Sequence, residues 1–407
     1  MTESVPDVYS LEGLSDVERS VLAAIDERAV VDFHCGLVRI PSVNPPGDVR
    51  EAIAYCEAPL KSAGFVVKTA AIDETMPNLI ATLGDGAGPT LLFNAHVDVV
   101  PTGERSAWRH DPFGAEIEAG KIYGRGAGDD KASVTAQVMA GLAIAGSGVA
   151  LRGSLVINEV ADEEAAGIKG AGYIVEQSLV TPDFVIVGEQ TMNRVALGEK
   201  GAAPTELVVR GRTAHGALPW EGANAIEAVA EVIVALRRDY WPILERRTHP
   251  HFHHSSGSVN MIGGGVKVNV VPDVASIYID RRLVPGEEPD AVRAEILEIA
   301  RQAVTKMSGI TVDLGNSLPG GSATLADERD PLVRAMIGAN GSLGLSTEPT
   351  GFSMATDGRY FARQGVPTII FGPGDPGLAH VPDEWVGIDE LVQATRAYAL
   401  TALRLLA

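Results

Sequence analysis

The sequence predicts an α/β protein, in which helices flank a mainly parallel sheet and a ferredoxin-like βαββαβ domain is inserted. Apolar runs typical of strands alternate with helical periodicities in the first half and the last quarter of the chain. The middle instead follows the order strand, helix, strand, strand, helix, strand. The 407 residues also exceed what one core usually supports. We expect one catalytic domain in two parts, 1–201 and 316–407, with the insertion at 202–315.

The first part opens with a helical pattern over residues 14–42, which stops near Pro41. A loop rich in proline and glycine follows, and a second helix over 49–64 ends at Gly64. Strands and helices then alternate. We expect strands at 65–70, 78–84, 90–100, 153–162 and 183–189, and helices at 131–146 and between the last two strands.

The insertion contains the same kinds of element in its own order. We expect strands at 202–212, 257–265, 268–285 and 310–315, and helices at 222–244 and 288–307. Beyond it, a helix over 330–344, a strand over 366–374 and a helix over 388–407 resume the first pattern. Such a compact unit can fold alone, which favours an inserted domain.

Composition excludes several classes of function. A formal net charge of −20 and a pI near 4.8 disfavour binding to nucleic acid or to an anionic membrane. No apolar run is long enough to span a bilayer. Cys35 and Cys56 are too few for a disulfide framework or a cysteine zinc site, and the first residues lack the pattern of a secretory signal. We therefore expect a cytoplasmic protein.

Residues capable of chemistry follow the strands. His96 and Asp98 are two residues apart in an apolar strand, so their side chains share a face. Taken alone, they are better explained by a hydrogen-bonded pair in the core. Their place near the carboxyl end of the strand is where ligands bind in open α/β sheets.

Four other segments have the same character. Asp129 and Asp130 stand in a glycine-rich loop that opens a helix, where a helix cap or a phosphate loop is the alternative. Further chemistry-bearing residues close or follow apolar strands: Asp162, Glu163, Glu164, Glu189 and His380. Each has an ordinary structural explanation. Together they form the mixture of imidazole and carboxylate that divalent metals prefer, in a number that suits two ions sharing a carboxylate.

These motifs in this order resemble the co-catalytic zinc amidohydrolase family. It includes acetylornithine deacetylase, succinyl-diaminopimelate desuccinylase, aminoacylase and glutamate carboxypeptidase. The matching motifs are His-x-Asp, Gly-Arg-Gly-x-x-Asp-x-Lys, Asp-Glu-Glu, Gly-Glu and a late His. The resemblance extends over nearly the whole chain, the insertion included.

The resemblance implies a role for each site residue. Asp129 would bridge two metal ions, Zn²⁺ first, with Co²⁺ or Mn²⁺ as alternatives. His96 and Glu189 would complete one ion, and Glu164 and His380 the other. Asp98 would accept the second N–H of the His96 imidazole. Glu163 would be the general base that takes a proton from the attacking water. A cis peptide between Asp129 and Asp130 is also implied.

The inserted domain supplies residues for the substrate in such enzymes. By the resemblance, His215 would reach the active site of a neighbouring subunit, which implies a homodimer through the insertion. Asn269 and Arg282 would bind the substrate carboxylate, with Arg281 as the alternative to Arg282. A histidine-rich tract at 249–254 is best read as a surface loop. Met354 and Ala355 stand where members often carry glycines, and these bulkier side chains would narrow or reshape the pocket near the catalytic centre.

We therefore expect a metal-dependent hydrolase that cleaves the amide bond of an N-acyl amino acid or similar carboxylate. The alternatives are a dipeptidase or carboxypeptidase, and an aminohydrolase that acts on an aryl amine. A metal-dependent binding protein without catalysis is the alternative from another class. Glu163 argues against it, because this residue serves catalysis and not metal binding.

Overall fold

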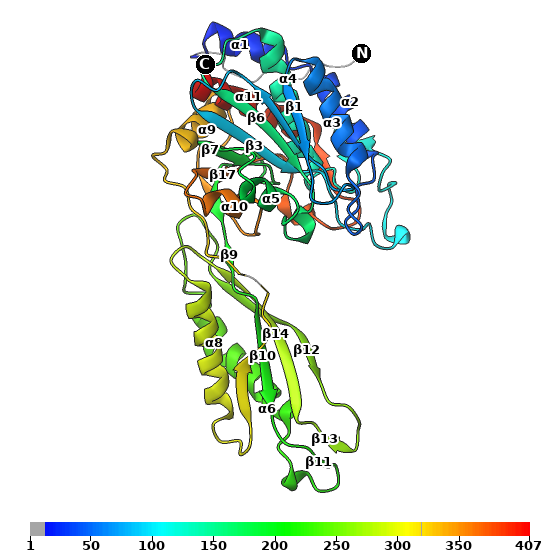
Figure 1. Ribbon diagram of the computed structural model, residues 1–407, viewed down its shortest axis with the longest axis vertical. Coiled ribbons are helices and arrows are strands. Elements are labelled where there is room, and N and C mark those ends of the chain that lie inside the picture. The colour runs from blue at the N-terminus through cyan, green and yellow to red at the C-terminus, as the bar shows by residue number, and fades with distance from the viewer. Residues whose placement is uncertain (1–12, 319) are drawn as a thin grey trace. The chain divides into compact units, whose positions relative to one another are not determined.

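The computed structural model describes residues 13–318 and 320–407 (Figure 1). The chain forms two compact units, of which the first is discontinuous in sequence. This first unit comprises the residues up to Gly198, Leu325–Phe352 and Thr356–Ala407. The second comprises Glu199–Thr324 and Ser353–Ala355.

An eight-stranded sheet is the centre of the first unit. Its strands are Val66–Ala70 (β1), Asn78–Leu83 (β2), Thr90–His96 (β3), Ser154–Val160 (β6), Phe184–Val187 (β7), Ala196–Glu199 (β8), Thr350–Phe352 (β16) and Thr368–Ile370 (β17). They lie in the order β1-β2-β6-β3-β7-β17-β8-β16.

The sheet is mixed, and its parallel part lies in the middle. β3 is parallel to β6 and β7, and β7 is parallel to β17. β1 and β2 are antiparallel to each other, β2 is antiparallel to β6, and β8 is antiparallel to β17. The α/β class is confirmed, but the parallel pairing is confined to the centre. One reason is that β1 and β2 follow each other through a short connection, which only antiparallel strands allow.

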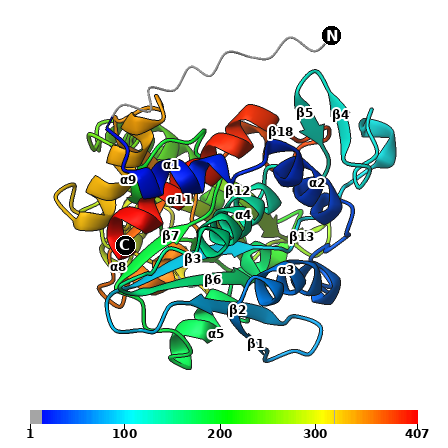
Figure 2. The same cartoon turned by 90° about the horizontal axis from the view of Figure 1, so that it is seen from above.

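Helices cover both faces of this sheet (Figure 2). One face carries Asp16–Ala23 (α1), Glu27–Val38 (α2), Arg50–Ser62 (α3), Lys131–Ser147 (α4), Pro331–Ser342 (α9) and Ile388–Leu406 (α11). The other face carries Ala171–Glu176 (α5) and Gly358–Ala362 (α10). Each face of the sheet has its own hydrophobic core, and successive side chains of β3 point to opposite faces. Phe93 packs in the core on the first face, and Leu92 packs in the core on the second.

The predicted helix over 14–42 is two helices in the structure. α1 ends at Ala23, and α2 begins after Asp26. The Asp26 side chain accepts a hydrogen bond from the backbone N–H of Ala29 at 2.9 Å, which caps α2. An aspartate at this position satisfies a donor that the helix leaves free, so a new helix starts there.

The parallel centre of the sheet positions the candidate site. In the register of the sheet, His96 of β3 pairs with Val160 of β6, and Asn94 of β3 pairs with Val187 of β7. The carboxyl ends of these three strands therefore meet at one edge. A small sheet in the order β18-β5-β4 lies in the same unit and joins Trp385–Gly387 (β18) to Lys121–Tyr123 (β5), beside Glu116–Glu118 (β4).

The second unit has the ferredoxin-like arrangement that the sequence predicts. Thr205–Arg210 (β10), Ser256–Gly264 (β12), Val274–Leu283 (β14) and Thr311–Leu314 (β15) form an antiparallel sheet in the order β12-β14-β10-β15. Helices Ala225–Ala235 (α6) and Pro289–Val304 (α8) pack against it. The shorter elements are Gly201–Ala202 (β9), Ala214–His215 (β11), Trp241–Leu244 (α7) and Val270–Val271 (β13).

The predicted strand over 268–285 is divided in the structure. β13 ends at Val271 and β14 begins at Val274, with Pro272 between them. Proline has no N–H to donate to a ladder, so the strand is interrupted there.

Three further expectations concern a membrane span, disulfides and a secretory signal. Among the described residues, no helix has both the length and the apolar character needed to cross a membrane. Cys35 and Cys56 are buried free thiols, in agreement with the absence of a disulfide framework. The expectation about a secretory signal falls on residues 1–12, which lie outside the described residues.

Candidate metal centre

His96 is the last residue of β3 and is 2% exposed. Its Nδ1 lies 2.9 Å from the backbone carbonyl of Asp98, and its Nε2 lies 3.2 Å from Oδ1 of Asp129. Only a protonated Nδ1 can donate to that carbonyl. The neutral tautomer therefore presents the lone pair of Nε2 toward the carboxylate, which is where a cation would bind both atoms.

Asp129 ends the glycine-rich loop before α4, and the peptide that joins it to Asp130 is cis, as the resemblance implies. The loop brings Asp129 to the carboxyl end of β3, although the two ligands are far apart in sequence. Its Oδ1 faces His96, and its Oδ2 lies 3.2 Å from Nε2 of His380. One carboxylate thus faces two imidazoles.

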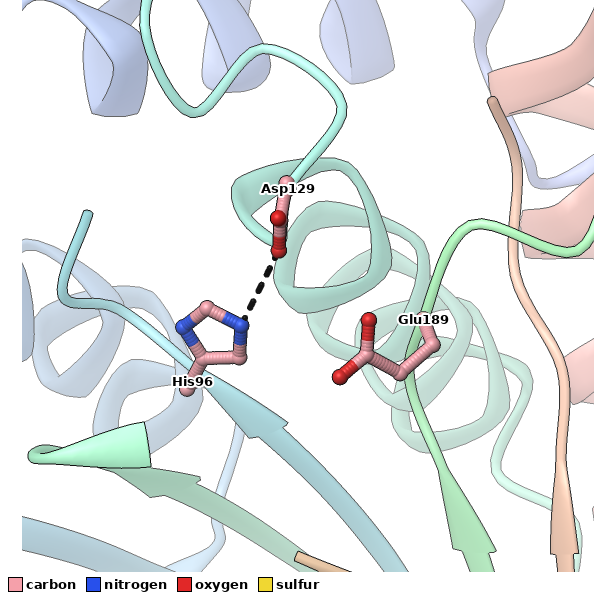
Figure 3. A group of neighbouring side chains, drawn as sticks. All are labelled: His96, Asp129 and Glu189. Atoms are coloured by element: carbon pink, nitrogen blue, oxygen red, sulfur yellow. Dashed lines mark hydrogen bonds and ion pairs between the residues drawn. The ribbon is translucent and has the colours of Figure 1, made fainter. Parts of the chain in front are cut away.

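Two groups of three ligands share Asp129. His96, Asp129 and Glu189 form the first triad, and all three are buried (Figure 3). Asp129, Glu164 and His380 form the second triad. Within each triad, ligand atoms from the three side chains lie within 4.8 Å of one another. The five residues predicted as metal ligands are therefore brought together in this arrangement.

The elements that supply the triads are the strand ends of the parallel centre and one late loop. Glu189 follows β7, and Glu164 lies in a short 3-10 turn after β6. The Nε2 of His380 lies 3.2 Å from the Glu164 carboxylate. The side chain of His380 is 52% exposed and that of Glu164 is 7% exposed, so the second triad is open on the histidine side.

The pKa values of the site residues reflect the crowding of carboxylates. Burial alone would raise the pKa of Asp129, but hydrogen bonds with His380 and His96 outweigh it and hold that pKa below its ordinary value. Hydrogen bonds with Asp129 and Glu164 raise the pKa of His380 to about 10. Burial, followed by the charges of Asp129 and Asp130, raises the pKa of Glu189 well above its ordinary value. Positive charge is thus strongly favoured between these side chains.

This donor set fits divalent cations. Two imidazoles and three carboxylates match the ligands of zinc and of the neighbouring transition metals. A buried group of carboxylates is costly unless it is paired with cations. Nε2 of His96 and Nε2 of His380 each lie 3.2 Å from a carboxylate oxygen of Asp129, which is close enough for one ion to bind both atoms of each pair.

Asp98 contacts more residues of the site than the resemblance implies. Its carboxylate Oδ1 lies 3.5 Å from Nδ1 of His96, which is farther than the carbonyl of the same residue. The two carboxylate oxygens accept hydrogen bonds from the backbone N–H groups of Glu163, at 3.3 Å, and Glu164, at 3.4 Å. Asp98 thus orients His96 through its backbone and the Glu163–Glu164 turn through its side chain.

Asn44 is a residue of this site that the sequence did not reveal. Its Nδ2 donates to Oδ2 of Asp98 at 2.9 Å, and the side chain is buried. The residue stands in the loop before α3, in a proline-rich segment that reads only as a turn. No signal in the sequence could have linked this amide to Asp98.

Glu163 lies next to the second triad. Burial raises the pKa of its carboxyl well above the ordinary value; the charge of His96 opposes this, while the charge of Asp357 adds to it. Asp357 is 2% exposed, and neither of its carboxylate oxygens has a hydrogen-bond partner. A carboxyl whose pKa is raised by burial is suited to both taking and giving a proton.

The residues predicted to bind substrate lie in the second unit. His215 of β11 pairs with Val270 of β13, and the backbone carbonyl of Asn269 accepts a hydrogen bond from the next residue after His215. The Nδ1 of His215 accepts from the backbone N–H of Ala217 at 3.1 Å, so its proton is on Nε2. His215 is therefore an exposed hydrogen-bond donor.

The two adjacent arginines have different surroundings. The Arg281 side chain is fully buried and pairs with Glu287. The Arg282 side chain is 35% exposed and pairs with Asp280 at 2.9 Å. Arg282 is thus the more accessible of the two arginines.

The histidine tract forms no comparable group. Of the residues that the structure describes, only the two triads bring three ligand atoms of this kind within 4.8 Å of one another. The rings of His249 and His251 are 5.6 Å apart, and the tract includes the exposed residue His253. This agrees with a surface loop.

Known proteins are similar to this chain over most of its length. The model of peptidase family M20/M25/M40 matches residues 92–404. A succinyl-diaminopimelate desuccinylase of Methylobacterium radiotolerans is 31% identical over 376 residues, which cover 89% of this chain and 93% of the relative.

Solved structures share the fold at low identity. Aminopeptidase PepT of Bacillus cereus has a TM-score of 0.75 at 21% identity, covering 94% of this chain and 99% of its own. The YXEP protein of Bacillus subtilis, described as a dinuclear metal binding peptidase, has a TM-score of 0.71 at 16% identity, covering 93% of this chain and 98% of its own. With the family model matching most of the chain, this protein belongs to peptidase family M20/M25/M40 and is a metallohydrolase.

Proposed function

We propose that the protein hydrolyses the amide bond of an N-acyl amino acid, or of a similar small molecule that bears a carboxylate, with two divalent ions as cofactors. The observation that carries the proposal is the pair of triads that share Asp129, with Glu163 beside them. The similarity to a desuccinylase supports an acyl amino acid as the substrate class.

In this proposal His96, Asp129 and Glu189 would hold one ion, and Asp129, Glu164 and His380 would hold the other. When bound, the two ions would lower the pKa of a water molecule toward neutrality and polarise the carbonyl to be attacked. Glu163 takes the proton of that water and gives it to the leaving amine. Asp98 keeps His96 in the tautomer that leaves Nε2 free.

We propose Zn²⁺ as the natural ion. Two imidazoles with carboxylates are a usual set for zinc, whereas magnesium and calcium prefer oxygen ligands alone. Co²⁺ and Mn²⁺ accept the same donors and would serve as substitutes.

Recognition of the substrate falls to the second unit in this proposal. Arg282 would bind the carboxylate, since a guanidinium pairs with it through two hydrogen bonds, and Asn269 would assist. His215 would donate its Nε2–H to the oxyanion or to the substrate in the active site of the partner subunit.

Replacing His215 by alanine is therefore expected to lower kcat by about 10²–10³-fold, the usual cost of losing one donor to an oxyanion. The metal content should stay at two ions per chain, because His215 belongs to neither triad. Steady-state kinetics and elemental analysis of the same sample would measure both. An unchanged kcat, or a loss of metal, would contradict this role.

A homodimer through the second unit is part of the proposal. β12 is an edge strand of its sheet, and the side chains of Met261 and Ile262 on it are 63% and 62% exposed. An edge strand that carries exposed apolar residues is a site of pairing with another chain.

Replacing Met261 and Ile262 together by lysine should convert the dimer to a monomer in sedimentation velocity. Charged groups on an edge strand oppose its pairing. Leu314→Lys is the matched control, because Leu314 is an exposed apolar residue on the opposite edge strand, β15. The proposed interface is wrong if the double variant keeps the mass of the wild type, or if the control variant alone dissociates.

A hydrolysis screen tests the activity itself. N-succinyl, N-acetyl and N-formyl amino acids and a set of dipeptides would be offered to protein freed of metal and then supplied with Zn²⁺. We expect release of the free amino acid from at least one acyl substrate, only when metal is present. Cleavage of dipeptides alone would favour the peptidase alternative. Aminopeptidase PepT is a peptidase with a similar fold. Failure to cleave any of these amides would contradict the proposal.

A further inference from the structure

A buried ion pair joins the two segments that carry Asp129 and His380. Arg125 Nη1 lies 2.5 Å from Oε2 of Glu384, and the two side chains are 2% and 0% exposed. Arg125 belongs to the glycine-rich loop, and Glu384 follows His380 by four residues. Neither residue belongs to the triads.

Glu384 is bonded directly to the backbone of the loop. Its Oε1 accepts hydrogen bonds from the N–H groups of Gly128 and Asp129, both at 2.9 Å. Its backbone carbonyl accepts from the N–H of Gly124 at 2.9 Å. Both ends of the loop are therefore tied to one residue, and one of the tied groups is the N–H of Asp129 itself.

Arg125 makes the reciprocal connection. Its Nη1 also donates to the backbone carbonyl of Val381 at 3.3 Å. Val381 follows His380, whose φ of 65° lies in the left-handed region that costs a histidine conformational energy. The contact therefore restrains the chain next to the histidine that the second triad uses.

We propose that the Arg125–Glu384 pair is a positioning device for the second metal ion, an inference that rests on the proposed dinuclear site. Through Glu384 the pair fixes the backbone of Asp129, and through Val381 it fixes the turn at His380. These are two of the three ligands in the second triad. The first triad takes its other ligands, His96 and Glu189, from strand ends that the pair does not touch.

A role in stability alone does not account for this geometry. A buried ion pair is weak evidence for stability, because the loss of hydration offsets much of the attraction. Arg281 and Glu287 form another buried pair in the second unit, and Glu287 is 10% exposed on its side chain. That pair contacts no member of either triad in the interactions that the structure records for it, so it provides the comparison.

The test is Zn²⁺ binding to the full-length chain by competition with a chromophoric chelator. Glu384→Gln should lower the affinity for one of the two ions by about 10–100-fold, the usual effect of losing a group that orients a metal ligand. The other ion should stay bound. His380→Ala supplies the benchmark for loss of the second ion, and Glu287→Gln is the control for loss of a buried carboxylate.

Four results decide the matter, with folding checked by circular dichroism. Weakening of the same ion as in His380→Ala, with Glu287→Gln binding both ions normally, supports the positioning role. Unchanged affinity for both ions, or equal weakening of both, overturns it. If Glu384→Gln does not fold, Arg125→Lys decides instead, since it keeps the charge but loses the fork that reaches Val381. A wild-type chain that binds fewer than two ions would overturn the proposed function itself.

Discussion

Replacing Glu163 by glutamine is expected to lower kcat by about 10²–10⁴-fold, the contribution usual for a general acid–base group. The amide keeps the size of the side chain but cannot take a proton from water. Both metal ions should remain, because Glu163 is in neither triad. Steady-state kinetics with the substrate found in the screen, together with metal analysis, would measure the two effects.

The control for this variant is Glu176→Gln. Glu176 is an exposed glutamate at the end of α5, in the same unit, so the change in charge is the same without a change at the site. It should leave kcat and metal content as in the wild type. Retention of full activity by Glu163→Gln would remove Glu163 from the mechanism.

Replacing Asp129 by alanine is expected to abolish activity and to remove bound metal. The reason is that Asp129 faces both His96 and His380 and is the only residue common to the two triads. Its loss also leaves imidazoles and carboxylates crowded together without the group that joins them. Metal analysis after dialysis would show the difference from Glu163→Gln, which keeps its ions.

The same variant has a thermal signature. A ligand that binds only the folded state stabilises it, so Zn²⁺ should raise the melting temperature of the wild type, and should raise it further as its free concentration increases. The melting temperature of Asp129→Ala should not respond to Zn²⁺ over the same range. Normal metal content in this variant would refute the bridging role.

Much of the fold was predictable because each element has a local cause. Strand runs such as 90–100 and 183–189 are apolar and short, and α4 follows a loop of glycine and aspartate residues, which marks the start of a helix in the sequence. The prediction failed where one polar residue determines the start of a helix, or where a short connection determines the direction in which a strand pairs. Asp26 starts a new helix, and the edge strand β1 is antiparallel to its neighbour β2. Periodicity alone does not report either feature.

The candidate site was predictable in its residues but less so in its contacts. Imidazole and carboxylate groups are common zinc ligands, so His96, Glu164 and Glu189 could be identified as candidate ligands at or after the ends of strands. The contacts of Asp98 were not predictable in detail, because they depend on distances between backbone atoms of separate strands.

The supporting residues escaped prediction for a physical reason. Asn44, Glu384 and Asp357 act through neighbours that are distant in sequence, and any of these residue types is common in a surface loop. Their burial, which is what makes them informative, exists only in the folded chain. Sequence patterns therefore identify the groups that perform chemistry more readily than the groups that hold them.

The most direct test of the proposed function is a titration of metal-free protein with Zn²⁺, in which bound metal and amide hydrolysis are followed in the same sample. We predict that two ions bind per chain and that hydrolysis of an N-acyl amino acid appears with them. Hydrolysis that persists after complete removal of metal, or binding of two ions without hydrolysis of any amide in the screen, would contradict the proposal.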